Sequence, residues 1–371
     1  MDYGLNEEQE MLRKMARDFL TTECPKSLVR EMVLNERGYT SELWHKMAEL
    51  GWMGLVFPEK YGGSGGTFLD LTVLFEEMGR ACLPGPFFAT VVLGGMTILE
   101  AGSESQKKEL LPKIAEGKLI FTLALYEPHG GYDVDKVTVE AVAEGDNYVI
   151  SGTKFFVPDA HIANYIICVA KTKNGVTLFL VDSKSAGISC TVLKTIAGDK
   201  QCEVVLNKVK VPKENILGKL GEGHVYLQEI LRKASVAKCA EMVGGAQQVL
   251  EMTVDYVKDR KQFGVPVGTF QAVQHHCANI ITDVDTSRFV TYQAAWRIAE
   301  GLPHAKEAAM AKAWVSDAYK RAAFLGHQCV GGVGLMEDHD MPLYVKRAKA
   351  AELTLGDADF HREAVAQALG L

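Results

Sequence analysis

The sequence contains no hydrophobic run of about 18 residues, the length at which a helix can cross a membrane. Its first residues, MDYGLNEEQEML, have neither the basic nor the apolar segment of an export signal. The eight cysteines are scattered, and they form no C-x-x-C pair and no other spacing typical of metal ligands. We therefore expect a cytoplasmic protein without a membrane span or a metal site, whose cysteines stay reduced.

An excess of basic charge is also absent. The chain has 40 lysines and arginines against 47 aspartates and glutamates, for a net charge of −7. This balance argues against nucleic acid as the main partner. The 371 residues are 47% hydrophobic, which is enough for a large core divided among two or three packed units.

The first 118 residues have the period of helices. In EEQEMLRKMARDFLTTE, four hydrophobic residues recur at helical spacing, namely Met11, Met15, Phe19 and Leu20. A further helix, SELWHKMAELGWMGL, has Ser41 in the position of an N-cap and is expected to stop near Gly51.

The period changes to two in the middle of the chain and returns to helical near residue 221. VTVEAVAEGDNYVISGTKFFV alternates around a turn at Gly145-Asp146-Asn147, and YIICVAKTKNGVTLFLVD alternates around Asn174-Gly175. The sequence therefore predicts an α+β multidomain fold: an N-terminal helical domain (1–118), a central β-barrel or sandwich domain (119–220) and a C-terminal four-helix-bundle domain (221–371).

Four short segments carry a resemblance to a known family: FPEKYGGSGG, YEPHGGYDV, DRKQFGVPVGTFQAVQ and HQCVGGVGLMED. With the order of the three blocks, they resemble the acyl-CoA dehydrogenase flavoproteins over essentially the whole chain. The resemblance implies an oxidoreductase that uses FAD to remove two hydrogens across the α and β carbons of an acyl-CoA thioester. A carboxylate takes the α-proton and the flavin takes the β-hydride. It also implies electron transfer to an electron-transferring flavoprotein and assembly as a dimer of dimers, in fatty acid or steroid side-chain catabolism.

In this family one half of each chain reaches over to the FAD of a neighbouring subunit. Arg260 is expected to close a long helix just before a Phe263-Gly264 turn, where its guanidinium suits a pyrophosphate oxygen. A cation that only complements the helix dipole is the simpler explanation for that arginine alone. The residues that match this half are Arg260, Phe263, Gln271, Gln328, Gly331 and Gly332.

The half that would cradle the flavin ring departs from the family. Tyr126 stands where the family has a threonine, and Tyr132 replaces a serine. Phe156-Val157-Pro158 replaces the family's Trp-x-Thr, and Pro158 has no backbone N–H to donate. Tyr126 and Phe156 are nevertheless the residues expected to lie against the cofactor.

The proton-abstracting glutamate of the family is also missing. The motif Tyr-Glu-Gly-Thr reads Thr354-Leu355-Gly356-Asp357 here, so Leu355 occupies the position of the base. The family's second location for a base falls at Ala234, with Ser235 beside it. Asp357 is the best-placed candidate for a relocated base; Glu352 lies on a neighbouring helix face and Glu241 is too far along its helix.

Three functions remain open from the sequence. The first is a base-lacking subunit that completes the FAD site of a homologous, glutamate-bearing partner, as in family members that act on steroid side chains. The second is a self-sufficient homotetramer with a relocated acid, and the third is a non-catalytic structural or regulatory homologue. The adjacent His275 and His276 point about 100° apart on a helix and are expected to pack or to lie at an interface rather than to bind metal. His129 is expected to be an exposed loop residue.

Overall fold

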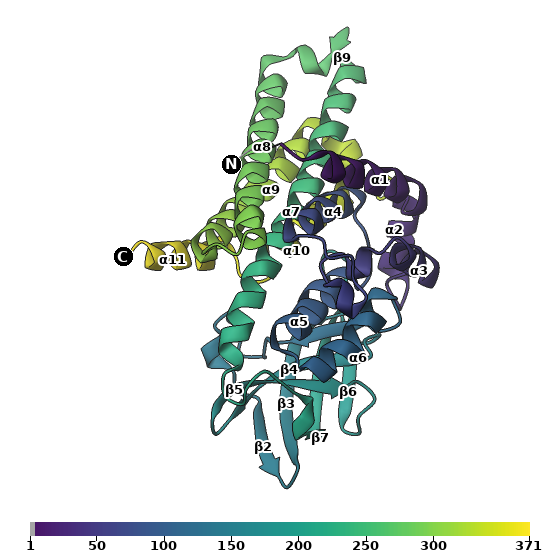
Figure 1. Cartoon of the computed structure of the whole chain (residues 1–371). Helices are drawn as coiled ribbons and strands as arrows, with labels where there is room; N and C mark the ends of the chain where they lie inside the picture. The colour runs from purple at the N-terminus through teal and green to yellow at the C-terminus, as the bar shows by residue number, and fades with distance from the viewer. Residues whose placement is uncertain (1–3) are drawn as a thin grey trace. The chain divides into compact units, whose positions relative to one another are not determined.

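The computed structural model describes residues 4–371, and these divide into two compact units (Figure 1). The first unit contains the chain up to Glu31, Thr67–Leu83 and Ser235–Leu371. The second contains Met32–Gly66 and Pro84–Ala234. Along the chain, helices are followed by a β block and then by helices again, so the predicted fold class is confirmed.

Helices dominate the chain before its first strand. They are α1 (Glu7–Glu23), α2 (Lys26–Leu34), α3 (Ser41–Glu49), α4 (Phe68–Ala81), α5 (Thr97–Ala101) and α6 (Glu104–Ala115), with the π-helix η3 (Phe88–Met96) and the short 3-10 turns η1 (Trp52–Gly54) and η2 (Glu59–Tyr61). Capping boxes begin three of these helices, at Asn6, Thr67 and Ser103, because each of these side chains accepts from the N–H three residues later.

Two details of the expected N-terminal helices are wrong. The N-cap of α3 is Thr40, which accepts from the N–H of Leu43 at 3.2 Å, and Ser41 is already the first helical residue. On α1, Met11 and Met15 are 71% and 41% exposed. Leu20 of the expected stripe is buried, and Gln9 and Ala16 complete the buried face of α1.

Polar contacts account for the orientation of α1. Gln9 donates to Asp70 at 2.9 Å, and Arg17 forms an ion pair with Glu77 at 2.7 Å. Both carboxylates belong to α4. A prediction from hydrophobic period alone could not include these contacts, because their partners lie 60 or more residues away.

Within residues 4–371, eight strands form one sheet in the order β6-β7-β3-β2-β4-β5-β8, with β1 parallel to β4. The strands are β1 (Phe121–Ala124), β2 (Glu140–Glu144), β3 (Asn147–Pro158), β4 (Tyr165–Thr172), β5 (Gly175–Asp182), β6 (Ile188–Leu193), β7 (Gln201–Pro212) and β8 (Ile216–Leu217), with 3-10 turns η4 (Val134–Lys136) and η5 (Lys213–Asn215). The first expected hairpin turns at Gly145-Asp146. The second turns at Lys173-Asn174, one residue earlier than expected, because Thr172 pairs with Gly175.

The chain after the sheet is again helical. It contains α7 (Gly223–Asp259), α8 (Gln271–Ala299), α9 (Ala305–Val330), α10 (Met341–Leu353) and α11 (Ala358–Ala368), the short strands β9 (Lys261–Gln262) and β10 (Val265–Pro266), and the 3-10 turns η6 (Val267–Thr269) and η7 (Gly331–Leu335). No helix among residues 4–371 is long and apolar enough to cross a bilayer.

In the first unit, glycines let α4 approach α7 closely. A Cβ atom at Gly244 would lie 1.7 Å from the main-chain oxygen of Glu76, and one at Gly79 would lie 1.8 Å from that of Glu241. No larger residue fits at such distances, since real Cβ atoms do not approach an oxygen below about 3 Å.

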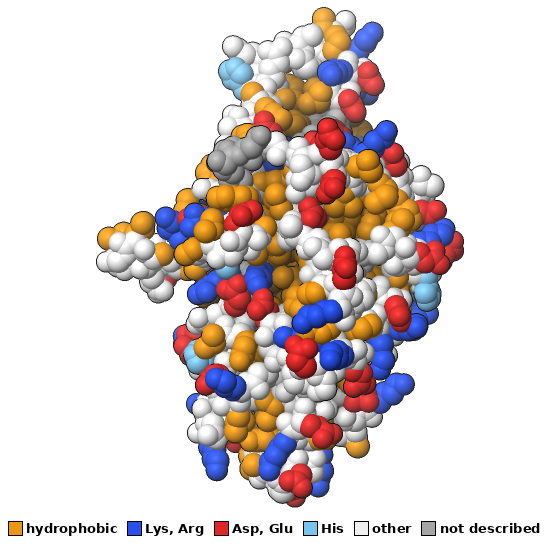
Figure 2. All heavy atoms as spheres, viewed as in Figure 1, with side chains coloured by type: hydrophobic (Ala, Val, Ile, Leu, Met, Phe, Trp, Pro, Cys, Tyr) orange, Lys and Arg blue, Asp and Glu red, His pale blue; other side chains and the backbone are white. Residues whose placement is uncertain are grey.

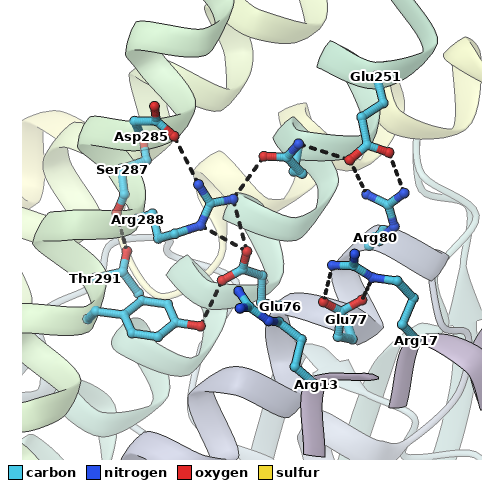
Figure 3. A network of polar contacts seen from close by, with 12 residues as sticks. Arg13, Arg17, Glu76, Glu77, Arg80, Glu251, Asp285, Ser287, Arg288 and Thr291 are labelled. Carbon is cyan, nitrogen blue, oxygen red and sulfur yellow. Dashed lines mark hydrogen bonds and ion pairs between the residues drawn. The ribbon is translucent and has the colours of Figure 1, made fainter. Parts of the chain in front are cut away.

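A buried polar network lies beside this crossing (Figure 3). Glu76 accepts from Arg288 at 3.0 Å and from the hydroxyl of Tyr292 at 2.9 Å. Arg80 pairs with Glu251 on α7. The network joins α4 to α7 and α8, and each buried carboxylate in it has a cationic partner, as burial of a charge requires.

Candidate functional site

The turn that holds Leu355 joins α10 to α11 in the first unit. Leu355 and Gly356 both have positive φ, at +63° and +103°. A leucine is rarely found in this left-handed region, so the surrounding contacts must hold it there. Its side chain is 8% exposed.

Lys312 holds this turn from α9. Its Nζ donates to the main-chain oxygens of Gly356 at 2.8 Å and Glu352 at 3.0 Å, and to the Ser316 hydroxyl at 3.0 Å. The lysine is fully buried, and burial lowers its pKa to about 8. All three N–H donors of the ammonium group therefore have acceptors within the protein.

His361 holds the turn from α11. Its Nε2 lies 2.9 Å from the main-chain oxygen of Leu355, so the ring donates there as the Nε2–H tautomer. Burial, with the charge of Lys312, lowers the pKa of His361 to about 4. The histidine is therefore neutral at pH 7.

The acidic residues near Leu355 in the sequence already have partners. Asp357 is the N-cap of α11, and its carboxylate accepts from the N–H of Phe360 at 2.9 Å. Glu352 pairs with Lys320 at 2.7 Å and Lys349 at 3.0 Å. Burial raises the pKa of Glu352, but the hydrogen bonds from these two lysines outweigh burial and lower it overall.

The three α7 residues singled out in the sequence are paired or buried. Glu241 pairs with Lys238 at 2.6 Å. Ala234 and Ser235 are both buried.

The tip between α7 and α8 presents the residues expected to reach another subunit. β9 and β10 form a two-residue hairpin around Phe263 and Gly264, whose φ values are +53° and +83°. Positive φ at both positions is the geometry of a tight hairpin turn. Phe263 is 91% exposed. Figure 2 shows hydrophobic and basic side chains together at this tip.

Arg260 directly follows the last residue of α7, as the sequence predicted. Its side chain is exposed, and among residues 4–371 it makes no ion pair or side-chain hydrogen bond. Gln271, the first residue of α8, is exposed as well. An unpaired guanidinium beside an exposed amide can bind an anionic group such as a pyrophosphate.

The end of α9 offers an open stretch of backbone. Gln328 is exposed, and the helix ends at Val330, after which Gly331 has a φ of +69°. A Cβ atom at Gly331 or Gly332 would have no other atom within 4 Å. Because nothing crowds these positions, another chain or a ligand can approach the backbone here.

In the second unit, Tyr126 and Phe156 belong to adjoining segments. The N–H of Phe155 donates to the main-chain oxygen of Tyr126 at 2.9 Å. Phe156 lies in a β-bulge with a φ of +51° and is 58% exposed. Pro158 ends this strand, and its carbonyl accepts from Thr122.

A buried ion pair supports the loop of Tyr126. Lys154, fully buried, donates to Glu127 at 2.6 Å and to the main-chain oxygen of Leu125 at 3.0 Å. Glu127 also accepts from the N–H groups of Thr138 at 2.8 Å and Val139 at 3.0 Å. Lys154 therefore holds both sequence neighbours of Tyr126, Leu125 and Glu127.

The three histidines singled out in the sequence differ in exposure. His129 and His275 are exposed and His276 is half-buried. No group of three or more metal-binding side chains that could hold an ion occurs among the described residues.

Sequence reasoning missed Lys312 and His361. The sequence contained a signal for Lys312. In AAMAKAWV the helical period places this lysine on the same face as small alanines and Val315, and that face of α9 is buried. Its acceptors were invisible, since Glu352 and Gly356 lie 40 and 44 residues away.

Comparison with known proteins defines the class. Three family models match: the acyl-CoA dehydrogenase N-terminal domain over residues 6–118, the middle domain over 122–209 and the C-terminal domain over 221–370. The Bacillus subtilis protein named "Probable acyl-CoA dehydrogenase YngJ" is 33% identical over 380 residues, covering 100% of both chains.

Solved structures agree. A chain from work on the electron transferring flavoprotein of Acidaminococcus fermentans is 30% identical, with a TM-score of 0.94 and coverage of 100% of this chain and 99% of the other. A chain of the ChsE4–ChsE5 complex from Mycobacterium tuberculosis is 28% identical, with a TM-score of 0.93 and coverage of 100% and 99%.

This protein belongs to the acyl-CoA dehydrogenase family. It is a FAD-dependent oxidoreductase that acts on CH–CH bonds of acyl-CoA thioesters.

The two halves of the chain fit FAD unequally. The first unit fits, because the unpaired cation at the α7–α8 tip and the open glycine backbone after α9 can each take phosphate groups of a dinucleotide. The strand end in the second unit fits poorly, because Pro158 has no N–H and Phe156 has no polar atom in its side chain.

Proposed function

We propose that this chain is the base-lacking subunit of an acyl-CoA dehydrogenase built from two different chains. In this assembly its α7–α8 tip completes the FAD site of a homologous, glutamate-bearing partner. The observation that carries the proposal is Leu355 itself: Lys312 and His361 hold the main chain of its turn, and its side chain supplies no carboxylate where the resemblance implies the family's base.

The missing carboxylate has a large effect on the chemistry. The α-proton of a thioester is weakly acidic, and a positioned general base typically contributes about 10²–10⁴-fold to the rate. Leu355 contributes nothing of this kind. Relocation to Asp357 has less support than the sequence suggested, because that carboxylate caps α11.

The proposed division of labour follows from the unequal halves. FAD, when bound, supplies the hydride acceptor for the reaction. Arg260 and Gln271 would bind the phosphates and adenosine of the partner's FAD, together with the Gln328–Gly332 segment. Tyr126 and Phe156 would line this chain's own, vestigial cradle, where Pro158 offers no donor.

Other parts of the proposal rest on relatives. The ChsE4–ChsE5 complex, whose name gives two chains, supports a heteromeric assembly such as a dimer of dimers. The similarity to a chain from work on an electron transferring flavoprotein supports such a protein as the electron acceptor. We also propose the domain boundaries 1–118, 119–220 and 221–371, and a cytoplasmic location.

The test compares the chain alone with the chain co-expressed with a glutamate-bearing homologue. Bound flavin is measured by absorbance, and turnover is measured on straight, branched and cyclic acyl-CoA thioesters with added FAD and an artificial electron acceptor. We expect little flavin and little turnover from the isolated chain, and both from the complex.

Leu355→Glu in the isolated chain should not restore turnover, because Pro158 still offers no backbone N–H to the flavin ring. Leu353→Glu, two residues earlier at a 46% exposed position, is the matched control. High turnover from the isolated wild-type chain would overturn the proposal in favour of a self-sufficient homotetramer. Loss of that turnover in Asp357→Asn would then identify the relocated base.

A second result would also overturn the proposal. If the complex binds flavin and keeps the partner's glutamate but turns over no thioester, this chain is better explained as a structural or regulatory homologue.

A further inference from the structure

Two cysteines and a histidine form a cluster in the second unit that the dehydrogenase reaction does not use. Cys190 lies on β6 and Cys202 on β7. In the register of these antiparallel strands, Cys190 is opposite Val204 and Cys202 is opposite Val192. The two cysteines are therefore diagonal neighbours on one face of the sheet.

The two thiols lie near enough to interact, and each shifts the pKa of the other. Cys190 is exposed on β6, an edge strand of the sheet, whereas Cys202 is buried behind it. An edge strand is held by one neighbour only, so it opens more readily than the strands inside the sheet.

His161 contacts Cys202 from the loop that follows β3. Its Nδ1 lies 3.7 Å from the Cys202 sulfur, and its Nε2 lies 2.9 Å from the main-chain oxygen of Glu36. Because Nε2 donates to that oxygen, Nδ1 faces the sulfur and can take the thiol proton. This is the arrangement by which a histidine generates a thiolate.

The electrostatics agree with the geometry. The interaction with Cys190 outweighs burial and, with His161, lowers the pKa of the Cys202 thiol to about 5. Burial opposes protonation of His161, but Cys202, Asp159 and the Glu36 carbonyl together outweigh burial and raise the pKa of the imidazole. Among the described residues no metal-binding group of three or more such side chains occurs, so the cluster is not a metal site.

We propose that Cys190 and Cys202 are an oxidisable dithiol that hydrogen peroxide converts to a cross-strand disulfide. The Cys202 thiolate attacks one peroxide oxygen and becomes a sulfenic acid, and the O–O bond breaks to release hydroxide. Cys190 then attacks the sulfenic sulfur. The S–S bond forms, the S–O bond breaks, and the Cys190 proton leaves with that hydroxyl as water. The two sulfurs together lose two electrons, and the peroxide gains them.

The chain contains a matched control pair. Cys277 on α8 and Cys329 on α9 also influence one another, but their thiol pKa values are raised by burial and no histidine contributes to either. The pKa of Cys329 is raised to about 11. Both therefore stay protonated at neutral pH, and a protonated thiol reacts slowly with peroxide.

The test treats the purified full chain with hydrogen peroxide at pH 7, followed by intact mass and peptide mapping. We expect the mass to fall by two hydrogen atoms, a cross-link between the Cys190 and Cys202 peptides, and full reversal by dithiothreitol. Cys277 and Cys329 should remain free thiols under the same exposure.

Variants separate the roles. In Cys190→Ser, oxidation should stop at a Cys202 sulfenic acid that dimedone traps. In His161→Ala, the rate of Cys202 oxidation should fall about tenfold, because less thiolate is present. His129→Ala, an exposed loop histidine of the same unit, should leave the rate unchanged.

Two results would overturn the proposal: Cys277 or Cys329 oxidising before Cys202, or Cys202 oxidising without a link to Cys190. Both are read on the wild-type chain, so the decision does not depend on any variant folding.

Discussion

The Nζ atom of Lys312 donates to the main-chain oxygen of Gly356 at 2.8 Å, and so the middle of α9 is tied to the turn that carries Leu355. The lysine has no exposed surface, and its other two donors go to Glu352 and Ser316. The turn of Leu355 is therefore held by a residue that has no acid–base role in our proposal.

Lys312→Met should destabilise the protein by about 1.5–3 kcal/mol, because buried acceptors lose a charged donor. The measurement is urea unfolding followed by circular dichroism. Lys320→Met is the control: this lysine, on the same helix, is 46% exposed and pairs with Glu352, so its loss should cost at most about 1 kcal/mol. Equal costs for the two variants would contradict this account of the turn.

His361 predicts a dependence of stability on pH. Its pKa is about 4 in the folded chain, against about 6.5 when unfolded. Between these values the unfolded state binds the proton and the folded state does not, so stability is full above about pH 6.5 and falls as the pH drops toward 4. The difference corresponds to about 3 kcal/mol.

Unfolding free energies measured from pH 7 to pH 4 check this prediction. His361→Asn should flatten the dependence, whereas substitution of the exposed His275 by Asn should leave it as in the wild type. An unchanged slope in His361→Asn would show that other groups cause the acid sensitivity.

The buried pair of Lys154 and Glu127 makes a third prediction. Lys154→Met or Glu127→Gln should each destabilise the chain by about 3–5 kcal/mol, because each leaves the other group buried without its partner. The control is Lys210→Met, which breaks an exposed pair with Glu144 on the same sheet and should cost at most about 1 kcal/mol. Thermal denaturation of the three variants distinguishes them.

Glu127 also adds to acid sensitivity. Burial raises the pKa of Glu127, but the hydrogen bonds from Lys154 and Thr138 outweigh burial and lower it below its usual range. The stability that this carboxylate contributes is present above its unfolded pKa and is lost as the pH falls through the folded one. Glu127→Gln should therefore remove part of the loss of stability at acid pH. If the ionisation of Glu127 did not contribute to stability, the variant would lose stability with pH as the wild type does.

Arg260 tests the proposed interface. In the complex with a glutamate-bearing partner, Arg260→Ala should weaken FAD binding by about 1.5–3 kcal/mol, or about 10- to 100-fold in Kd. Lys261→Ala removes the adjacent exposed positive charge and is the control. Equal flavin affinity in both variants and the wild type would exclude Arg260 from the cofactor site.

The sequence by itself determined the features that depend on neighbouring residues. The change from helical to strand period and back determined the order of the three blocks, because period decides which face of each element can be buried. The Phe263-Gly264 turn and the place of Arg260 at the end of α7 were equally local. The leucine at position 355 was visible as well, because it is a matter of residue identity, whereas its assignment to the family's base position remains part of our proposal.

Only the tertiary structure decided which polar groups meet. Lys312 and Gly356 are 44 residues apart, and Cys202 and His161 are 41 apart, so no period in the sequence joins them. Asp357 was a plausible base in the sequence, and the fold makes it a helix cap. The physical reason is common to all of these: a buried charge, donor or acceptor must find a partner, and packing brings that partner from a distant segment.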